Sequence, residues 1–189
     1  MDEINLKYNY LCSTPSDINE HLPVIKKYAE MCETVTEMGV RYVVSTWALL
    51  SAKPKSIVCY DILEGLDMNI FNHNIGEIYK SASNIGVDFN FIHSDVLKIE
   101  IEETDLLLID TYHEYNQIKE ELKLHGNKSK KFLIFHDTTT YGDFGETFKT
   151  PNTIGIWPAI EEFLKENPHW YIEERLTNNN GLTILKRKK

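Results

Sequence analysis

The sequence predicts an α/β fold with a doubly wound, mostly parallel seven-stranded sheet that ends in an antiparallel C-terminal hairpin strand. Short runs that are apolar throughout alternate with helix-like segments through five repeats, which is the pattern of consecutive βα units. Runs without polar residues are typical of strands buried on both faces, as in a parallel sheet. Near the C-terminus, two strand-like runs flank residues 177–181, an Asn- and Gly-rich segment that predicts a hairpin turn.

The first half of the chain supplies an opening helix and three strands. We expect the helix over residues 17–32, with Asp17 as its N-cap and Glu20 at the capping-box position, which leaves Pro23 in the first turn. The other elements expected here are a strand over 35–39, a helix over 41–52, a strand over 57–60, a helix over 74–83 and a strand over 89–93.

The second half continues the alternation and closes the sheet. We expect a strand over 106–109, a helix over 115–124, a strand over 132–135, a helix over 156–165, and strands over 170–176 and 182–186. The polar loop at 138–153 is long for a connection in such a fold, and loops of this length often act as lids. Together these elements predict a Rossmann-like sheet.

Length and composition predict one soluble domain rather than several. A chain of 189 residues, 42% apolar and 26% charged, is expected to form a single domain over 1–189, with an N-terminal helical segment at 1–33. The three cysteines form no CxxC motif, which argues against a disulfide framework and for a reducing compartment. Since no apolar stretch is long enough to span a bilayer, we expect a cytoplasmic protein without a membrane partner.

The charge balance bears on the kind of partner. A formal net charge of −9 argues against nucleic acid, because phosphate contacts require a basic face. A neutral or cationic small molecule, or a glycan acceptor, fits this charge better than a polyanion. The sequence leaves open whether the chain forms a homo-oligomer or belongs to a larger polypeptide.

Carboxylates and imidazoles follow two of the predicted strands directly. Asp110 and His113 come after the run at 106–109, and His136 and Asp137 come at the end of the run at 132–135. Parallel sheets bind their ligands just beyond the carboxyl ends of the strands. Side chains of these types at one edge are therefore candidates for metal binding and acid–base chemistry.

Acidic residues also mark the ends of the earlier strands. Glu37 lies in the first strand before Gly39, Asp61 ends the second strand, and Asp95 follows the third. An acid after the second strand of a nucleotide-binding fold accepts hydrogen bonds from ribose hydroxyls, whereas Asp95 is equally consistent with a helix cap. The first turn has one glycine and lacks the GxGxxG loop that binds pyrophosphate. This pattern favours a ligand with a ribose and a base but no phosphates.

In this order and spacing, the motifs resemble those of class I S-adenosylmethionine-dependent methyltransferases. The resemblance is to the metal-dependent sugar and antibiotic O-methyltransferases related to macrocin O-methyltransferase and the cephalosporin-biosynthesis methyltransferase, and it covers nearly the whole chain. The segments that carry it are Glu37-Met38-Gly39 with Ser45-Thr46, Asp61, Ser94-Asp95, Asp110-Thr-Tyr-His113, His136-Asp137-Thr138 and 155–163. It implies methyl transfer from S-adenosylmethionine to a hydroxyl group of a sugar or a glycosylated metabolite.

The resemblance also implies roles for individual residues. The cofactor would lie against Glu37, Met38, Gly39 and Ser45 at its methionine end, Asp61 at its ribose, Ser94 and Asp95 at its adenine, and Asp110. Asp110 and Asp137 would hold a divalent metal, Mg²⁺ or Mn²⁺, and His113 would act as the general base beside Asp110. His136 departs from the relatives, several of which have an acid there, and it is a candidate third metal ligand, a residue behind the ligands, or a packed strand-end histidine.

Two other functions remain open from the sequence. One is a metal-dependent hydrolase that uses the His136–Asp137 pair, and the other is a non-catalytic S-adenosylmethionine-binding module of a larger protein. In the loop, Tyr141, Asp143 and Phe144 are candidates for acceptor contacts. We expect His21 and His125 at the surface, because neither has a motif around it.

Overall fold

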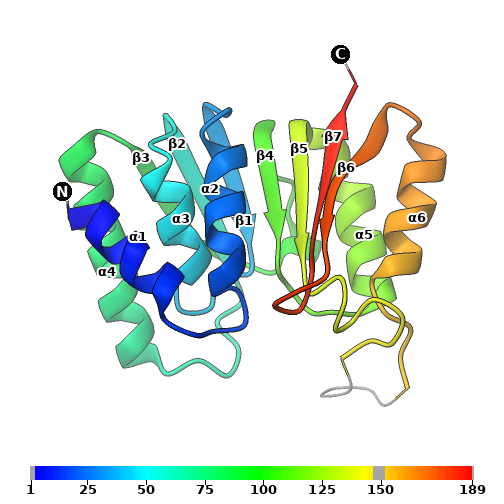
Figure 1. The fold of residues 1–189 in the computed structure, drawn as a ribbon, viewed down its shortest axis with the longest axis horizontal. Helices are drawn as coiled ribbons and strands as arrows, with labels where there is room; N and C mark the ends of the chain where they lie inside the picture. Colours follow the sequence, from blue (N-terminus) through cyan, green and yellow to red (C-terminus); the bar gives the residue numbers. More distant parts are fainter. Residues whose placement is uncertain (1–2, 147–151, 189) are drawn as a thin grey trace.

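A seven-stranded sheet lies between two layers of helices, as predicted (Figure 1). The structure, a computed structural model, describes residues 3–146 and 152–188. The strand order across the sheet is β3-β2-β1-β4-β5-β7-β6. The strands are β1 (Thr34–Met38), β2 (Ser56–Asp61), β3 (Asp88–His93), β4 (Thr104–Ile109), β5 (Ser129–His136), β6 (Trp170–Leu176) and β7 (Leu182–Arg187).

The order of the strands creates a switch point beside β1. Strands β1 to β5 pair in parallel, and β7 is antiparallel to both β5 and β6, which confirms the predicted hairpin. From β1 the chain builds the sheet outward through β2 and β3, and then returns to place β4 on the other side of β1. Ligands of doubly wound sheets bind at this reversal, beyond the carboxyl ends of the strands.

Two apolar clusters, one on each face of the sheet, hold the layers together. Leu106 and Leu108 of β4 pack on one face with α1 to α4, whereas Leu107 and Ile109 pack on the other face with α5 and α6. Successive side chains of a strand point to opposite faces, so an apolar run is what a strand covered on both sides requires. The helices are α1 (Glu3–Ser13), α2 (Leu22–Ala29), α3 (Val44–Ser51), α4 (Met68–Ile85), α5 (Tyr115–His125) and α6 (Trp157–Glu166), with 3₁₀ turns η1 (Asn19–His21), η2 (Val96–Lys98) and η3 (Gly126–Lys128).

The N-terminal segment differs from the single helix expected over 17–32. The chain forms α1, then a turn, and α2 begins only at Leu22, with Pro23 in its first turn. Proline suits this position because it lacks the N–H that would be left without a partner there. Asp17 is not an N-cap; its carboxylate instead lies 2.7 Å from the Arg41 guanidinium, in the loop that follows β1.

Helix α4 is longer than the sequence predicted. It begins at Met68 rather than near residue 74, because Asp67 caps it by accepting hydrogen bonds from the backbone N–H groups of Asn69 and Ile70. Gly86 ends the helix in a left-handed conformation with φ of 75°.

The expected lid at 138–153 is described in part, since residues 147–151 lie outside the described range. Phe144 and Ile154 form an antiparallel bridge, and the backbone of Gly145 donates a hydrogen bond to the Thr153 carbonyl at 2.9 Å. The two described sides of the loop therefore pair with each other at residues 144–145 and 153–154. That the loop acts as a lid stays a prediction.

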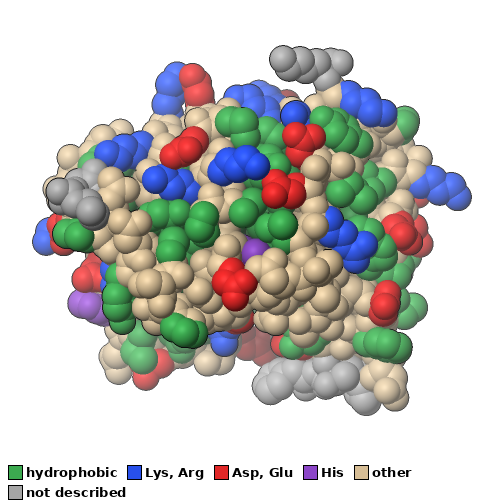
Figure 2. Space-filling model, viewed as in Figure 1, with side chains coloured by type: hydrophobic (Ala, Val, Ile, Leu, Met, Phe, Trp, Pro, Cys, Tyr) green, Lys and Arg blue, Asp and Glu red, His purple; other side chains and the backbone are tan. Residues whose placement is uncertain are grey.

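The surface carries charges of both signs. In Figure 2, Lys and Arg side chains are interspersed with Asp and Glu over the face in view. Over residues 3–146 and 152–188, we find no helix with the length and apolar character that crossing a membrane requires.

Gly39 sets the contact between the ends of β1 and β4. It has φ of 82°, and a Cβ placed on it would lie 1.9 Å from the carbonyl oxygen of Asp110. Gly65 has a similar φ of 75°, but a Cβ there would meet nothing within 4 Å. The two glycines thus separate the effect of backbone conformation from the effect of close packing.

We predict that Gly39→Ala lowers the free energy of unfolding by on the order of 3 kcal/mol or more, since it adds a clash to the strain of a positive φ. Gly65→Ala should lower it by only about 1–2 kcal/mol, the conformational part alone. Urea denaturation followed by circular dichroism measures both. Equal losses in the two variants would show that the contact between Gly39 and Asp110 is not tight.

Candidate active site

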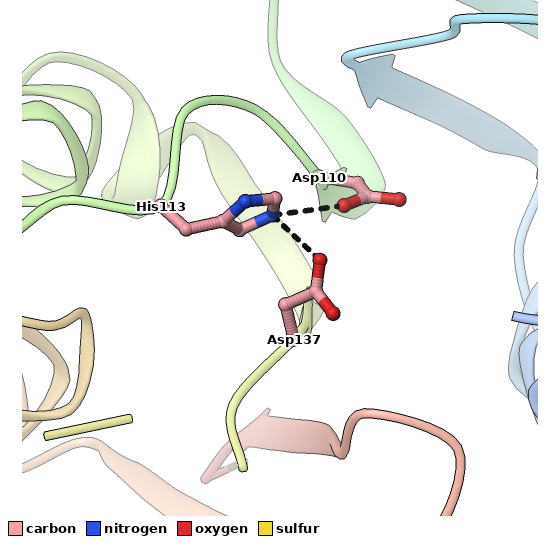
Figure 3. Close-up of side chains that lie close together, drawn as sticks. All are labelled: Asp110, His113 and Asp137. Carbon is pink, nitrogen blue, oxygen red and sulfur yellow. Dashed lines mark hydrogen bonds and ion pairs between the residues drawn. The ribbon is translucent and has the colours of Figure 1, made fainter. Parts of the chain in front are cut away.

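Three side chains predicted from the sequence converge beyond the ends of β4 and β5. Asp110 follows β4, His113 lies in the turn before α5, and Asp137 follows β5 (Figure 3). The Nε2 atom of His113 is 3.2 Å from Asp110 Oδ1 and 2.9 Å from Asp137 Oδ2. Each residue offers one atom that can bind a metal, and these three atoms lie within 4.8 Å of one another.

The register of the sheet brings these residues together. Ile109 is paired with Phe135 across the parallel strands β4 and β5, so the residues that follow each strand emerge side by side. Asp137 has φ of 61°, a left-handed conformation that aspartate tolerates better than most residues. The chain thus turns immediately after β5 with the carboxylate at the sheet edge.

Glu146, which the sequence analysis missed, holds the other side of the His113 ring. Its Oε2 atom is 3.1 Å from His113 Nδ1, and its backbone N–H donates to the His113 carbonyl at 2.9 Å. The ring of Tyr141 stacks on the imidazole, with centroids 4.9 Å apart and an interplanar angle of 11°. Two residues of the 138–153 loop therefore fix the orientation of His113.

The ionisation of the cluster follows from these contacts. Burial disfavours a charged His113, but hydrogen bonds with Asp110, Asp137 and Glu146 outweigh it and raise its pKa well above the usual value. For Asp110, burial acts to raise the pKa, yet the contacts with His113 and His136 hold it well below its usual range. These contacts favour the protonated imidazole, which has no free nitrogen lone pair for the general-base role expected of His113.

His136 lies behind the two carboxylates and is almost fully buried, at 2% exposure. Its Nδ1 atom is 3.4 Å from Asp110 Oδ1 and 3.5 Å from Asp137 Oδ2. Burial opposes its charge, but the two acids raise its pKa to about 10. His136 is not among the three residues whose atoms could bind one metal ion. Its buried ring instead lies next to both carboxylates, where a positive charge offsets theirs.

His21 and His125 are buried, contrary to the surface positions expected for them. The His21 ring packs edge-on against His136, with centroids 5.5 Å apart, and burial lowers its pKa. The Nε2 atom of His125 is 2.8 Å from the Val96 carbonyl, a contact with η2. Neither histidine has a local sequence motif, because each finds its neighbours through tertiary contacts.

The turn between β6 and β7 connects the N-terminal segment to the site. The backbone N–H of Glu20 donates to the Asn179 side chain at 3.0 Å, and the backbone N–H of Thr139 donates to the Asn180 carbonyl at 2.8 Å. This turn, residues 177–181, thereby positions His21 on one side and the start of the 138–153 loop on the other.

Glu37 is fully buried below the turn that follows β1. Its carboxylate accepts hydrogen bonds from the hydroxyls of Ser45 and Thr46, at 2.5 Å and 2.6 Å, and from Cys59 Sγ at 3.2 Å. Burial raises its pKa to about 7 although these hydrogen bonds favour the ionised form. Glu37 and Ser45, both expected at the methionine end of a cofactor, therefore link β1 to the first turn of α3.

Asp61, the acid predicted to bind a ribose, faces the loop after β1. Its Oδ2 atom accepts hydrogen bonds from the backbone N–H groups of Val40 and Arg41 at 2.7 Å and 2.9 Å, and Oδ1 accepts one from Leu63 at 2.6 Å. Because a carboxylate has roughly four acceptor positions, room remains for about one further donor, such as a ribose hydroxyl.

Of the remaining predicted cofactor residues, Ser94 and Asp95 lie at the edge of the sheet and Met38 lies in the core. The backbone N–H of Ser94 donates to the Asp61 carbonyl at 3.0 Å, so Ser94 and Asp95 lie beside the end of β2. Asp95 caps η2 by accepting from the Leu97 N–H at 3.0 Å, which confirms the alternative left open for it. The Met38 side chain packs in the core and is fully buried.

Glu121 is a second buried acid that the sequence analysis missed. It accepts hydrogen bonds from Thr111 Oγ1 at 2.9 Å and Gln117 Nε2 at 2.7 Å, and so anchors the residue next to Asp110 to α5. Burial raises its pKa to about 7. It does not reach the surface, which makes its role one of support.

No protein-family model and no curated protein matches this sequence. Among solved structures, a protein assigned as a caffeoyl-CoA O-methyltransferase from Staphylococcus aureus is 12% identical over 99% of this chain and 93% of its own, with a TM-score of 0.70. An O-methyltransferase from Bacillus cereus, in complex with SAH, is 13% identical over 100% and 92%, with a TM-score of 0.66. TomG from Streptomyces achromogenes, an O-methyltransferase of tomaymycin synthesis in complex with SAM, is 12% identical over 100% and 91%, with a TM-score of 0.58. The chain has the fold that these O-methyltransferases share, which confirms the predicted fold class.

We predict a pH-dependent effect of Glu121→Gln on stability. With the pKa of Glu121 raised from 4.5 to about 7 in the fold, the folded chain binds this proton more tightly than the unfolded chain. The contribution of Glu121 to stability is therefore fully present below about pH 4.5 and is lost as the pH rises through about 7. Glutamine cannot ionise and avoids this loss.

The stability of Glu121→Gln relative to the parent protein should rise by roughly 1–3 kcal/mol between pH 4.5 and pH 8, measured by urea denaturation across that range. Glu120→Gln is the matched control on the same helix, where the side chain is 47% exposed. A constant difference across the pH range would contradict the assignment.

Proposed function

We propose that the chain is an S-adenosylmethionine-dependent O-methyltransferase whose acceptor is a hydroxyl group of a sugar or glycosylated metabolite, with assistance from a divalent metal. One observation carries the proposal: the cluster of Asp110, His113 and Asp137 lies directly beside Gly39, at the switch point of the sheet. A cofactor at the end of β1 and an acceptor at the cluster would therefore be neighbours. The fold shared with SAM- and SAH-bound O-methyltransferases supports this.

The residues at the ends of β1, β2 and β3 fit a nucleoside without phosphates. Asp61 retains acceptor capacity for a ribose hydroxyl, and Ser94 and Asp95 lie beside it where a base would extend. When bound, S-adenosylmethionine supplies a methyl group on a sulfonium centre, which an oxygen nucleophile attacks in line. In this proposal, the residues at the end of β1 and Asp110 would hold the methionine end of the cofactor.

The acceptor hydroxyl has to lose its proton, and the contacts within the cluster limit which groups can accept it. Both nitrogens of His113 contact carboxylates, and the pKa values of Asp110 and Asp137 are lowered by the two histidines after burial is taken into account. None of these groups is a ready base at neutral pH. A divalent cation, when bound, lowers the pKa of a coordinated hydroxyl, which supports metal assistance here.

The donor set fits such a cation. Asp110, His113 and Asp137 offer two oxygens and a nitrogen within 4.8 Å, and the Oδ1 atom of Asp137 is buried without a hydrogen-bond partner among the residues described. Buried carboxylate oxygens are normally satisfied, so an atom of this kind suits a site that takes up another group. Mg²⁺ and Mn²⁺ both accept carboxylate ligands.

Features around the cluster support a carbohydrate acceptor. Tyr141 stacks on His113, and Phe144, from the same loop, is 79% exposed. Aromatic faces pack well on the apolar faces of sugar rings. The net charge of −9 agrees with a neutral or cationic acceptor. We also propose a cytoplasmic location, because Cys12, Cys32 and Cys59 are free thiols.

We predict that S-adenosylmethionine and its demethylated product raise the melting temperature in a thermal-shift titration, since a ligand of the native state stabilises it by about 2.7 kcal/mol at 100 times its Kd. NADH is the control, because the first turn lacks a pyrophosphate loop. If neither sulfur nucleoside shifts the melting temperature, the methyltransferase proposal is wrong.

We predict that Asp137→Asn lowers the rate of methyl transfer by on the order of 100-fold or more while leaving cofactor affinity within about threefold. Asparagine tolerates the left-handed backbone at this position. Transfer of radiolabel from S-adenosylmethionine to a panel of glycosides measures the rate, and calorimetry with the demethylated product measures affinity. Cofactor binding without transfer in the parent protein would instead indicate a binding module.

A further inference from the structure

We propose that His113 is itself a metal ligand, together with Asp110 and Asp137, and that Glu146 is the positioning residue that fixes it in this role. The inference rests on the metal-assisted function proposed for the same site. It departs from the general-base role that the resemblance implies for His113, and it assigns a role to Glu146, which lies 33 residues further along the chain.

The two nitrogens of His113 have different partners. Nδ1 is 3.1 Å from Glu146 Oε2, whereas Nε2 lies between Asp110 Oδ1 and Asp137 Oδ2. When Nδ1 donates its hydrogen to a carboxylate, the neutral imidazole carries its lone pair on Nε2. Metal-bound histidines in proteins are oriented by this kind of hydrogen bond from the distal nitrogen to a carboxylate.

The spacing around Nε2 matches that of atoms bound to one ion. Ligands held at roughly 2.0–2.2 Å from a metal are separated from each other by roughly 2.9–3.5 Å. The distances from Nε2 to Asp137 Oδ2 and Asp110 Oδ1 are 2.9 Å and 3.2 Å. Both distances from Nε2 fall within this range, and all three candidate ligand atoms lie within 4.8 Å of one another.

A second observation concerns the other oxygen of the Asp137 carboxylate, the one that does not face His113. The Oδ1 atom of Asp137 has no hydrogen-bond partner among the described residues, and the side chain is only 6% exposed. Since such an atom is costly to bury, it is consistent with a carboxylate that completes its interactions on a bound cation.

Both the side chain and the backbone of Glu146 contact His113. Besides the contact with Nδ1, the Glu146 N–H donates to the His113 carbonyl at 2.9 Å, and the Tyr112 hydroxyl donates to the Glu146 carbonyl at 2.9 Å. Tyr141 covers one face of the ring. The imidazole is thus oriented toward the two acids before a metal arrives, which lowers the cost of binding.

A site of one imidazole and two carboxylates has a preference among metals. Imidazole ligands suit Fe²⁺, Ni²⁺, Cu²⁺ and Zn²⁺, whereas Mg²⁺ favours oxygen ligands. We therefore expect the protein to take a transition metal in preference to Mg²⁺.

The test is a titration of the metal-free protein with Co²⁺, which reports nitrogen ligation through its visible absorption bands. His113→Asn should weaken Co²⁺ binding by on the order of 100-fold and alter the bands, and Glu146→Gln should weaken it by about 10–100-fold. Asp143→Asn is the matched control, because it removes an exposed carboxylate from the same loop and should leave Co²⁺ affinity unchanged. A large excess of Mg²⁺ should not displace Co²⁺.

A measurement on the unmutated protein guards against variants that fail to fold. With ¹⁵N-labelled histidine, Zn²⁺ should shift the Nε2 resonance of His113 and leave Nδ1 protonated. The proposal is overturned if Nε2 does not shift, if the parent protein takes up no Co²⁺, or if either variant binds Co²⁺ as tightly as the parent. Binding of S-adenosylmethionine is measured separately, so its failure would overturn the proposed function while metal ligation by His113 stands.

Discussion

The contact between Gly39 and the carbonyl of Asp110 is the constraint on which the rest of the site depends. No side chain fits at Gly39, so the end of β1 lies directly against the end of β4. On one side of this contact the loop after β1 folds onto Asp61, and on the other side Asp110 meets His113. The loop after β1 and the acid–histidine cluster therefore share a boundary made of backbone, which no change of rotamer can move.

The site offsets most of its charge internally. Two histidines of raised pKa face three carboxylates, Asp110, Asp137 and Glu146, which leaves one negative charge in excess when both imidazoles are protonated. Buried ion pairs are sensitive to the removal of one member, because the partner is then left as an isolated charge. A metal that enters this cluster competes with a proton for Nε2 of His113. Occupancy is then linked to pH by the chemistry of the ligands themselves.

The sequence was sufficient to predict the sheet and the pair of acids at its edge. The features that it did not predict were missed for physical reasons. An apolar run such as 106–109 reports burial on both faces directly, and residues after neighbouring parallel strands must emerge together, which located Asp110 and Asp137. Helix α1 buries only Ile4 and Tyr8, too few positions to show a helical period. Glu146, Glu121 and His21 acquire their partners through tertiary contacts, so nothing in their local sequence marks them.

The Asn-rich turn between β6 and β7 has a consequence for how the molecule tolerates change. Hairpin turns at the surface are usually the places where insertions and new termini are accepted. Here the turn holds Glu20 through Asn179 and Thr139 through Asn180, and thereby connects segments from both halves of the chain next to the site. Lengthening this hairpin, or opening the chain there to make a circular permutant, would loosen the surroundings of His136 from more than one direction. In this fold, the turn therefore supports the candidate site from both halves of the chain.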